Sequence, residues 1–217
     1  MPRSMLADVR EVGDEAIHER LAEVLAPVYE QLHGRLSPRA DERFLDLNAF
    51  EGTAEYLPFD DGEFNVALSA FAFIWAPDHA NVAAELARVT ASGGRIGFTA
   101  WKPNPKLGAL YRQFTEEPLE GRESTEWGRE DHVEDMLGDD FELDFEDGTL
   151  WLDVESGEDL WQLFRYSSPP VVSMLDRLDD ENGEAFHRAF VELFETYREG
   201  GRVRAPRRYL MTFGRRR

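Results

Sequence analysis

The first part of the chain combines one long amphipathic pattern with a short apolar run. Apolar residues recur at three- and four-residue spacing over residues 14–33, which predicts a helix that ends at Gly34. After a polar stretch, residues 44–50 are mostly apolar and compatible with a buried strand, although Asp46 and Asn48 interrupt the run.

The middle of the chain carries the clearest pattern. An apolar segment at 64–73 is followed by a Pro-Asp pair at 77–78 that opens a helix, by a Ser-Gly-Gly stop at 92–94, and by a second apolar run at 96–101. Strand, helix, glycine stop and strand form one βαβ unit. We therefore expect residues 64–69 and 96–101 to be adjacent parallel strands, buried on both faces and joined by a right-handed crossover.

The second half of the chain has mainly helical patterns. Helical spacing covers four segments, which are 107–114, 129–137, 158–164 and 181–197. Two alternating runs, 141–145 and 149–153, flank Glu146-Asp147-Gly148 and predict a β-hairpin. Residues 207–213 predict a closing strand.

Composition narrows the possible functions. The chain has 217 residues, of which 42% are hydrophobic, which is enough for one large domain or two small ones. A net charge of −20 disfavours a nucleic-acid surface or an anionic membrane face. The absence of cysteine excludes disulfides, thiolate metal sites and cysteine nucleophiles. No apolar run suggests a signal peptide or a membrane span, so we expect a cytoplasmic protein.

The basic residues are almost all arginine, because Lys102 and Lys106 are the only lysines. An acidic, lysine-poor surface is typical of a protein kept in solution at high salt, where repulsion between charges is screened. A GC-rich genome would produce the same imbalance without a physical purpose. The sequence favours neither explanation.

Three segments follow one another in a specific order and spacing. Residues 51–59 read EGTAEYLPF, residues 61–69 read DGEFNVALS, and residues 85–95 read ELARVTASGGR. They resemble the adenine segment, the fourth strand, and the fifth helix with its glycine turn in class I S-adenosylmethionine (SAM) dependent methyltransferases, in the branch that acts mostly on small molecules. The C-terminal half is similar to the substrate region of that branch.

The resemblance implies an α/β fold with a Rossmann-like methyltransferase sheet, reduced at its N-terminal half, and a helical C-terminal substrate cap. It divides the chain into a core at 1–103 and a cap with closing strands at 104–217. It also implies SAM as the cofactor and a small molecule as the methyl acceptor. By the same resemblance, the cofactor-binding residues are Asp46, Thr53, Ala54, Glu55, Ser69 and Phe71.

The chain departs from this family around the cofactor. The family's Gly-x-Gly-x-Gly loop, which lets the backbone approach the ligand, is missing, and residues 48–50 are too bulky to replace it. The second strand with its ribose-binding acid is missing too, as if about 50 residues were absent after Leu47. Thr53 replaces the adenine-binding acid and Asn65 replaces an Asp. Residues 44–50 then form either the first strand, which we favour, or the third.

Three functions follow. The first is SAM-dependent methyl transfer to a small molecule, and the alternative is a non-catalytic binding or partner module that has lost its cofactor site. The third is a minimal SAM binder that a second copy completes as a homodimer. The segment 46–53 discriminates among them, because its backbone amides either form a vacant nest or are consumed in the sheet.

Several other residues have two interpretations. His79 is a candidate general base or a solvated residue in the first turn of a helix. The cluster at 130–135 has metal-ligand residue types, but neighbouring helical positions point apart, so we favour a solvated acidic face and no metal. The aromatics between 71 and 75 line a pocket or pack on the sheet. The arginines between 207 and 217 form a partner for acidic groups or, more commonly, a frayed tail.

The high-salt interpretation predicts the response of the melting temperature to potassium chloride. Repulsion among 44 acidic groups is screened as the salt rises to molar concentration, so Tm should increase in a thermal unfolding series. A flat or falling Tm would favour the genome-composition explanation.

Overall fold

The computed structural model describes residues 14–117, 119 and 122–217. Its centre is a six-stranded sheet in which β1, β2, β3, β6 and β4 lie side by side in that order and β5 adds to β6. The strands are β1 (Phe44–Asp46), β2 (Phe64–Ala70), β3 (Thr90–Trp101), β4 (Phe141–Val154), β5 (Arg198–Glu199) and β6 (Arg202–Arg216). No helix in the described part of the chain combines the length and apolar character needed to cross a bilayer.

Seven α-helices and two 3₁₀ turns accompany the sheet in the described residues. They are α1 (Asp14–Leu36), the turn Phe73–Trp75, α2 (His79–Val89), α3 (Pro105–Tyr111), the turn Arg122–Gly128, α4 (Glu130–Leu137), α5 (Gly157–Ser167), α6 (Pro169–Leu175) and α7 (Asp180–Glu195). The predicted helices are all present with shifted bounds, whereas α6 was not predicted. This helix has only seven residues and begins with two prolines. Proline is common at the start of a helix, but seven residues are too few to show a helical pattern.

The predicted βαβ unit is confirmed. β2 pairs with β3 in parallel, with Ala67 opposite Ile96, and most of both strands is buried. The helix α2 connects them, and the carboxylate of Asp78 caps it by accepting from the N–H of Asn81 at 3.0 Å. The apolar face of α2, which includes Leu86, is part of the main core.

The short strand β1 resolves the two assignments of residues 44–50. It pairs with β2 in parallel, so that Leu45 lies opposite Ala67. In a doubly wound sheet of strand order 3-2-1-4-5, the first strand is the neighbour of the fourth. Because β2 corresponds to the fourth strand, β1 takes the place of the first, as favoured from the sequence.

The predicted hairpin around Glu146-Asp147-Gly148 is wrong. Residues 141–154 form the single strand β4, which pairs with β6 along its whole length. Gly148 lies directly opposite Tyr209, and a Cβ at this glycine would come within 2.1 Å of the tyrosine ring. The glycine therefore makes room for an aromatic side chain, and the local turn signal is overridden by a long antiparallel partner.

The predicted closing strand is confirmed, and the frayed-tail interpretation of the C-terminal arginines is wrong. β6 lies between β3 and β4 and is antiparallel to both. Some of its arginines pair with carboxylates on or next to β4, since Arg208 reaches Asp147 at 3.1 Å and Arg216 reaches Asp140 at 2.8 Å. A strand in the interior of the sheet is held by hydrogen bonds on both edges and does not fray.

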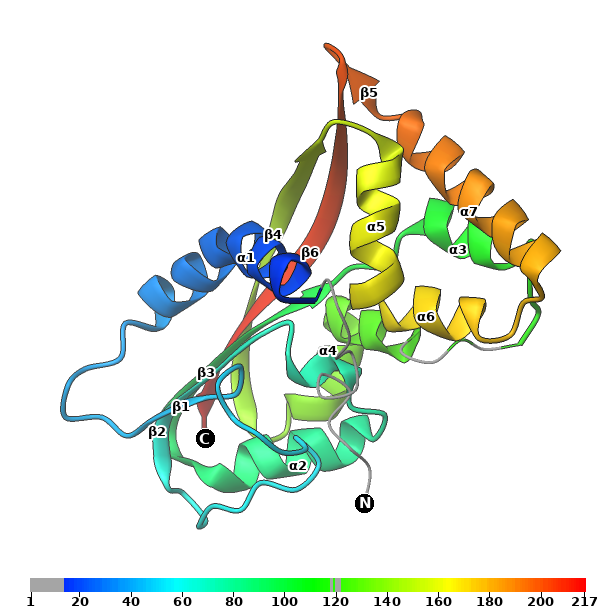
Figure 1. The fold of residues 1–217 in the computed structure, drawn as a ribbon. Coiled ribbons are helices and arrows are strands. Elements are labelled where there is room, and N and C mark those ends of the chain that lie inside the picture. Colours follow the sequence, from blue (N-terminus) through cyan, green and yellow to red (C-terminus); the bar gives the residue numbers. More distant parts are fainter. Residues whose placement is uncertain (1–13, 118, 120–121) are drawn as a thin grey trace.

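The helices occupy two regions around the sheet (Figure 1). The helix α1 covers one face, where Leu36 lies against Gly97, while the turn at 122–128 places Trp127 against Phe98 on the opposite side. A second apolar cluster joins α3, α5, α6 and α7 to the far ends of β4 and β6. The main core also draws on Phe141 and Leu210, so the division of the chain at residue 103 stays a prediction.

Burial of α2 generates a stability prediction. Leu86 is 2% exposed within the main core, so Leu86→Ala should lower the free energy of unfolding by about 2 to 5 kcal/mol, the range for a buried leucine. Chemical denaturation measures this loss. The control is Val172→Ala at a position that is 38% exposed, where about 1 kcal/mol or less is expected. Equal losses in the two variants would contradict the core position of Leu86.

Candidate functional site

The carboxyl ends of β1 and β2 lie side by side, which in an open α/β sheet is the crevice where ligands bind. Asp46 ends β1, and both of its carboxylate oxygens have partners. The Tyr29 hydroxyl donates to Oδ2 at 2.5 Å and the Asn48 N–H donates to Oδ1 at 2.9 Å. Burial and the bond to this carboxylate raise the pKa of Tyr29 to about 12, so the hydroxyl stays a donor at neutral pH.

The backbone amides that follow Asp46 are consumed within the protein. Leu47 N–H donates to the carbonyl of Leu68 at 2.9 Å, and Ala49 N–H donates to the carbonyl of Asp46 at 3.1 Å. The N–H of Asn48 is bonded to the Asp46 carboxylate. Residues 47–49 therefore form no vacant nest of donors for a ligand.

The side chain of Asn48 links the end of β1 to the end of β2. Its Nδ2 donates to the carbonyl of Ala70 at 2.7 Å, and its Oδ1 accepts from the N–H of the same residue at 2.7 Å. An asparagine amide thus continues the parallel pairing of β1 and β2 by one residue. A glycine at this position would leave both Ala70 groups free.

The adenine-type segment keeps its place but bonds to itself. The Thr53 hydroxyl is hydrogen-bonded to the Glu55 carboxylate and also accepts from the Glu55 N–H at 3.2 Å. The Phe50 ring lies over Gly52, where a Cβ would come within 2.4 Å of it. Ala54 packs against the main core. The threonine hydroxyl is therefore engaged locally, and an aromatic ring fills the space beside the glycine.

Residues 57–61 are clamped to α2 by an arginine that the sequence reasoning did not single out. Arg88 donates to the carbonyls of Leu57 and Phe59 at 2.9 and 2.7 Å and to the carboxylates of Glu85 and Asp61 at 2.7 and 2.9 Å. The Arg88 hydrogen bond holds the pKa of Glu85 below its ordinary value. The three-residue spacing of Glu85 and Arg88 on a helix is the signal that could have indicated this pair.

Ser69 and Phe71, at the end of β2, have structural contacts. Ser69 is buried, and its hydroxyl accepts from the N–H of Phe73 at 3.2 Å. Phe71 has a φ of +57°, a left-handed conformation that costs a non-glycine residue about 1 to 3 kcal/mol. Its ring stacks on Trp101 with centroids 3.8 Å apart. This aromatic stack supports the turn that leaves β2.

His79 lies in a cluster with a second histidine. Its Nδ1 is 2.9 Å from Nε2 of His132 in α4, and both rings pack against Trp127. His132 is therefore half-buried against α2, whereas the sequence interpretation placed the cluster 130–135 on a solvated face. Within the residues that the structure describes, no three His, Asp or Glu side chains are grouped to hold a metal ion.

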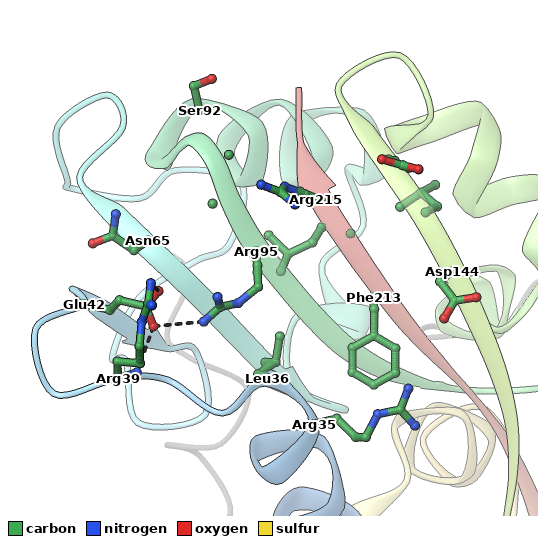
Figure 2. Close-up of a pocket in the computed structure, with 16 residues that line it drawn as sticks. Arg35, Leu36, Arg39, Glu42, Asn65, Ser92, Arg95, Asp144, Phe213 and Arg215 are labelled. Carbon is green, nitrogen blue, oxygen red and sulfur yellow. Dashed lines mark hydrogen bonds and ion pairs between the residues drawn. The ribbon is translucent and has the colours of Figure 1, made fainter.

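A pocket of the described residues lies at the opposite end of the strands, beside the amino ends of β2 and β3 (Figure 2). It is an open groove of about 850 Å³ at the amino end of β3, lined by Arg95, Arg39, Glu42 and other residues. Figure 2 shows Arg95 reaching Glu42, whose Oε2 is 2.9 Å from the guanidinium. The N–H of Arg39 and the charge of Arg95 hold the pKa of Glu42 below its ordinary value. Arg39 and Arg95 are thus both paired with Glu42, and the groove lies at the end of the strands opposite to Asp46.

Comparisons with known proteins relate this chain to methyltransferases. A family model described as a methyltransferase domain matches residues 20–98. An uncharacterized protein of Mycobacterium tuberculosis is 37% identical over 115 residues, which are 50% of this chain and 41% of the relative. The demethylmenaquinone methyltransferase of Thermus thermophilus is 36% identical over 83 residues, which are 37% of this chain and 38% of that enzyme. The chain thus spans about two fifths of the length of these curated relatives.

A solved structure shows the same fold. A protein of Bacillus halodurans that is assigned as a methyltransferase superposes with a TM-score of 0.55 at 17% identity. The match covers 86% of this chain and 97% of that one. The α/β sheet with its helical cap is therefore the methyltransferase fold predicted from the sequence.

The Asn48 bridge generates a second stability prediction. Asn48→Ala removes both bonds to Ala70, and the strand end loses about 1 to 3 kcal/mol of unfolding free energy, because its backbone groups are left without partners. Denaturant unfolding measures the loss. Asn182→Ala is the matched control, since that amide is exposed and bonds only to the nearby Asp179; about 0.5 kcal/mol is expected. The prediction fails if Asn48→Ala is as mild as the control.

Proposed function

We propose, from the premise that this chain belongs to the class I methyltransferase family, that its chemistry is SAM-dependent methylation of a small molecule. The observation that carries the proposal is the parallel pairing of β1 with β2, which brings Asp46 to the crevice at the carboxyl ends of the two strands. The match of the family model to residues 20–98 supports it. Thr53 and Ala54 come just before the segment that Arg88 holds. The resemblance to the family implies that these two residues recognise adenine.

The residues after β1 fit the methionine part of SAM poorly. When bound, SAM supplies an activated methyl group on a sulfonium, which family members present to a nucleophile. The methionine part of SAM requires free backbone donors after the first strand, and those of residues 47–49 are consumed. The Phe50 ring also occupies the space beside Gly52. The methionine side of the site therefore does not fit the cofactor as a glycine loop would.

A weakened cofactor site follows from this partial fit. The glycine loop, the ribose-binding acid and the adenine-binding acid each supply a polar contact that this chain lacks. A buried ligand group without its partner costs about 1 to 3 kcal/mol, so three such losses weaken binding by two or more powers of ten. We propose that this chain by itself holds SAM with a dissociation constant no tighter than about 100 μM.

The second candidate function is a non-catalytic binding module of the same family. The two hydrogen bonds between Asn48 and Ala70 favour it, because the Ala70 N–H and carbonyl groups are bonded within the protein and are not free for a cofactor. The two candidates share the cap and differ in whether SAM enters the crevice. A homodimer that completes the site at the edge strand β1 is the further possibility, and its signature would be tight binding that depends on protein concentration.

Isothermal titration with SAM, S-adenosylhomocysteine and adenosine tests both candidates. We expect SAM to bind at about 100 μM or more weakly, and adenosine to bind within a few fold of SAM, because the methionine side adds little. The oligomeric state is measured by light scattering at the same protein concentration.

Micromolar binding of SAM to a demonstrated monomer, with adenosine much weaker, would contradict the proposed weak site. It would require a replacement cradle at 48–53 and 69–71. Complete absence of heat with all three ligands would favour the non-catalytic module.

A further inference from the structure

Arg207 lies where the central sheet meets the helices α3 and α5, and we call this place, between Trp101, Tyr111 and Phe164, the seam. Arg207 is on β6, two residues before Tyr209, so the two side chains leave the same face of the strand. The guanidinium lies 4.7 Å from the centre of the Trp101 ring and 5.8 Å from that of Phe164 in α5. Tyr111 of α3 is also close enough for the arginine charge to affect its pKa. Three separate elements therefore surround one cation.

Arg207 has no anionic partner among the described residues, in contrast to three other arginines of β6. Arg202 pairs with Asp153, Arg208 with Asp147 and Arg216 with Asp140. In the described parts of the chain, no carboxylate lies within ion-pair distance of the Arg207 guanidinium. The chain carries 44 acidic residues, so a cation without a carboxylate is not explained by any shortage of them.

The surroundings of Arg207 are apolar, yet the side chain stays charged. Burial lowers the pKa of Arg207, but a guanidinium is not deprotonated in proteins. Burial also raises the pKa of Tyr111 to about 12, so this hydroxyl keeps its proton at neutral pH. The seam thus offers a fixed cation and a phenolic hydroxyl between aromatic rings.

The seam connects to the candidate cofactor crevice through stacked rings. Trp101 contacts Arg207 on one side and stacks on Phe71 with an interplanar angle of 11°. Phe71 directly follows the carboxyl end of β2. Arg207 and Trp101 are half-buried, so each residue keeps a part of its surface in contact with solvent.

We propose that Arg207 and Trp101 form the binding site for a small molecule with an apolar body and one oxyanion, a carboxylate or a phosphate. The planar guanidinium would pair with the two oxygens of such a group. The aromatic side chains next to the guanidinium, Trp101 and Phe164, would give the apolar body an apolar surrounding. That this molecule is the methyl acceptor rests on the proposed function. The binding site itself does not require SAM.

Benzoate, phenyl phosphate and neutral benzamide are suitable probes, titrated without SAM at constant ionic strength set by potassium chloride. Tryptophan fluorescence and isothermal titration report binding. We expect saturable binding of benzoate or phenyl phosphate at least about tenfold tighter than that of benzamide, because a charge-assisted bidentate pair forms only with the anions. The preferred anion distinguishes a carboxylate ligand from a phosphate ligand.

Two substitutions separate Arg207 from general charge effects. Arg207→Gln should weaken binding of the anionic probe at least about tenfold. The matched control is Arg204→Gln, because Arg204 is on the same strand and lies 4.8 Å from the centre of the Trp151 ring, away from the seam. That variant should bind within about twofold of wild type. Circular dichroism confirms that each variant is folded.

Equal weakening in both variants, or anionic and neutral probes that bind wild type equally, would overturn the proposal. The comparison of probes needs no variant, so it holds even if Arg207→Gln does not fold. Binding of an anion that depends on Arg207, combined with no binding of SAM in the titration above, would support this site and contradict the proposed methyl transfer. The opposite pattern would contradict this site alone.

Discussion

The bridge between the Asn48 amide and the Ala70 backbone is the constraint on which the candidate site depends. It joins the carboxyl ends of β1 and β2 with two hydrogen bonds of 2.7 Å. A parallel pair of three-residue strands has few ladder bonds of its own, so this extra pairing matters for holding β1 on the sheet. The same backbone groups would otherwise face the ligand crevice. Stability of the strand end and affinity for a cofactor therefore compete for the same atoms.

The sequence predicted those parts of the fold that are set by local pattern. Two apolar runs joined by a capped helix specify β2, α2 and β3, because both faces of such strands must be covered. The pattern failed at Glu146-Asp147-Gly148, where a composition typical of a turn lies inside β4. The ring of Tyr209 fills the place beside Gly148, and that residue is 61 positions away in the chain. Long-range pairing of this kind leaves no local signal.

The candidate site could be predicted only as a set of missing groups. The sequence predicts that the family's glycine loop is missing, but it does not show that the Leu47 amide bonds to Leu68 on β2, a strand that begins at Phe64. The contact of His79 with His132 joins residues 53 positions apart, and the cation contact of Arg207 with Trp101 joins two strands. Each arrangement depends on how elements pack, which periodicity does not report.

Arg88, which holds residues 57–61, and Arg207 in the proposed binding site differ in how many of their N–H groups are bonded within the protein. Exposed pairs such as Arg202 with Asp153 contribute little, because water and salt screen them. Arg88 is different, because its guanidinium donates to two carbonyls and two carboxylates. These bonds leave no N–H group of Arg88 for a ligand. Arg207 has rings on its faces and no carboxylate, so its hydrogen-bonding capacity is not spent on an ion pair. A protein with a net charge of −20 repels small anions at long range, so an anion would be held at the seam by direct contacts rather than by the overall field.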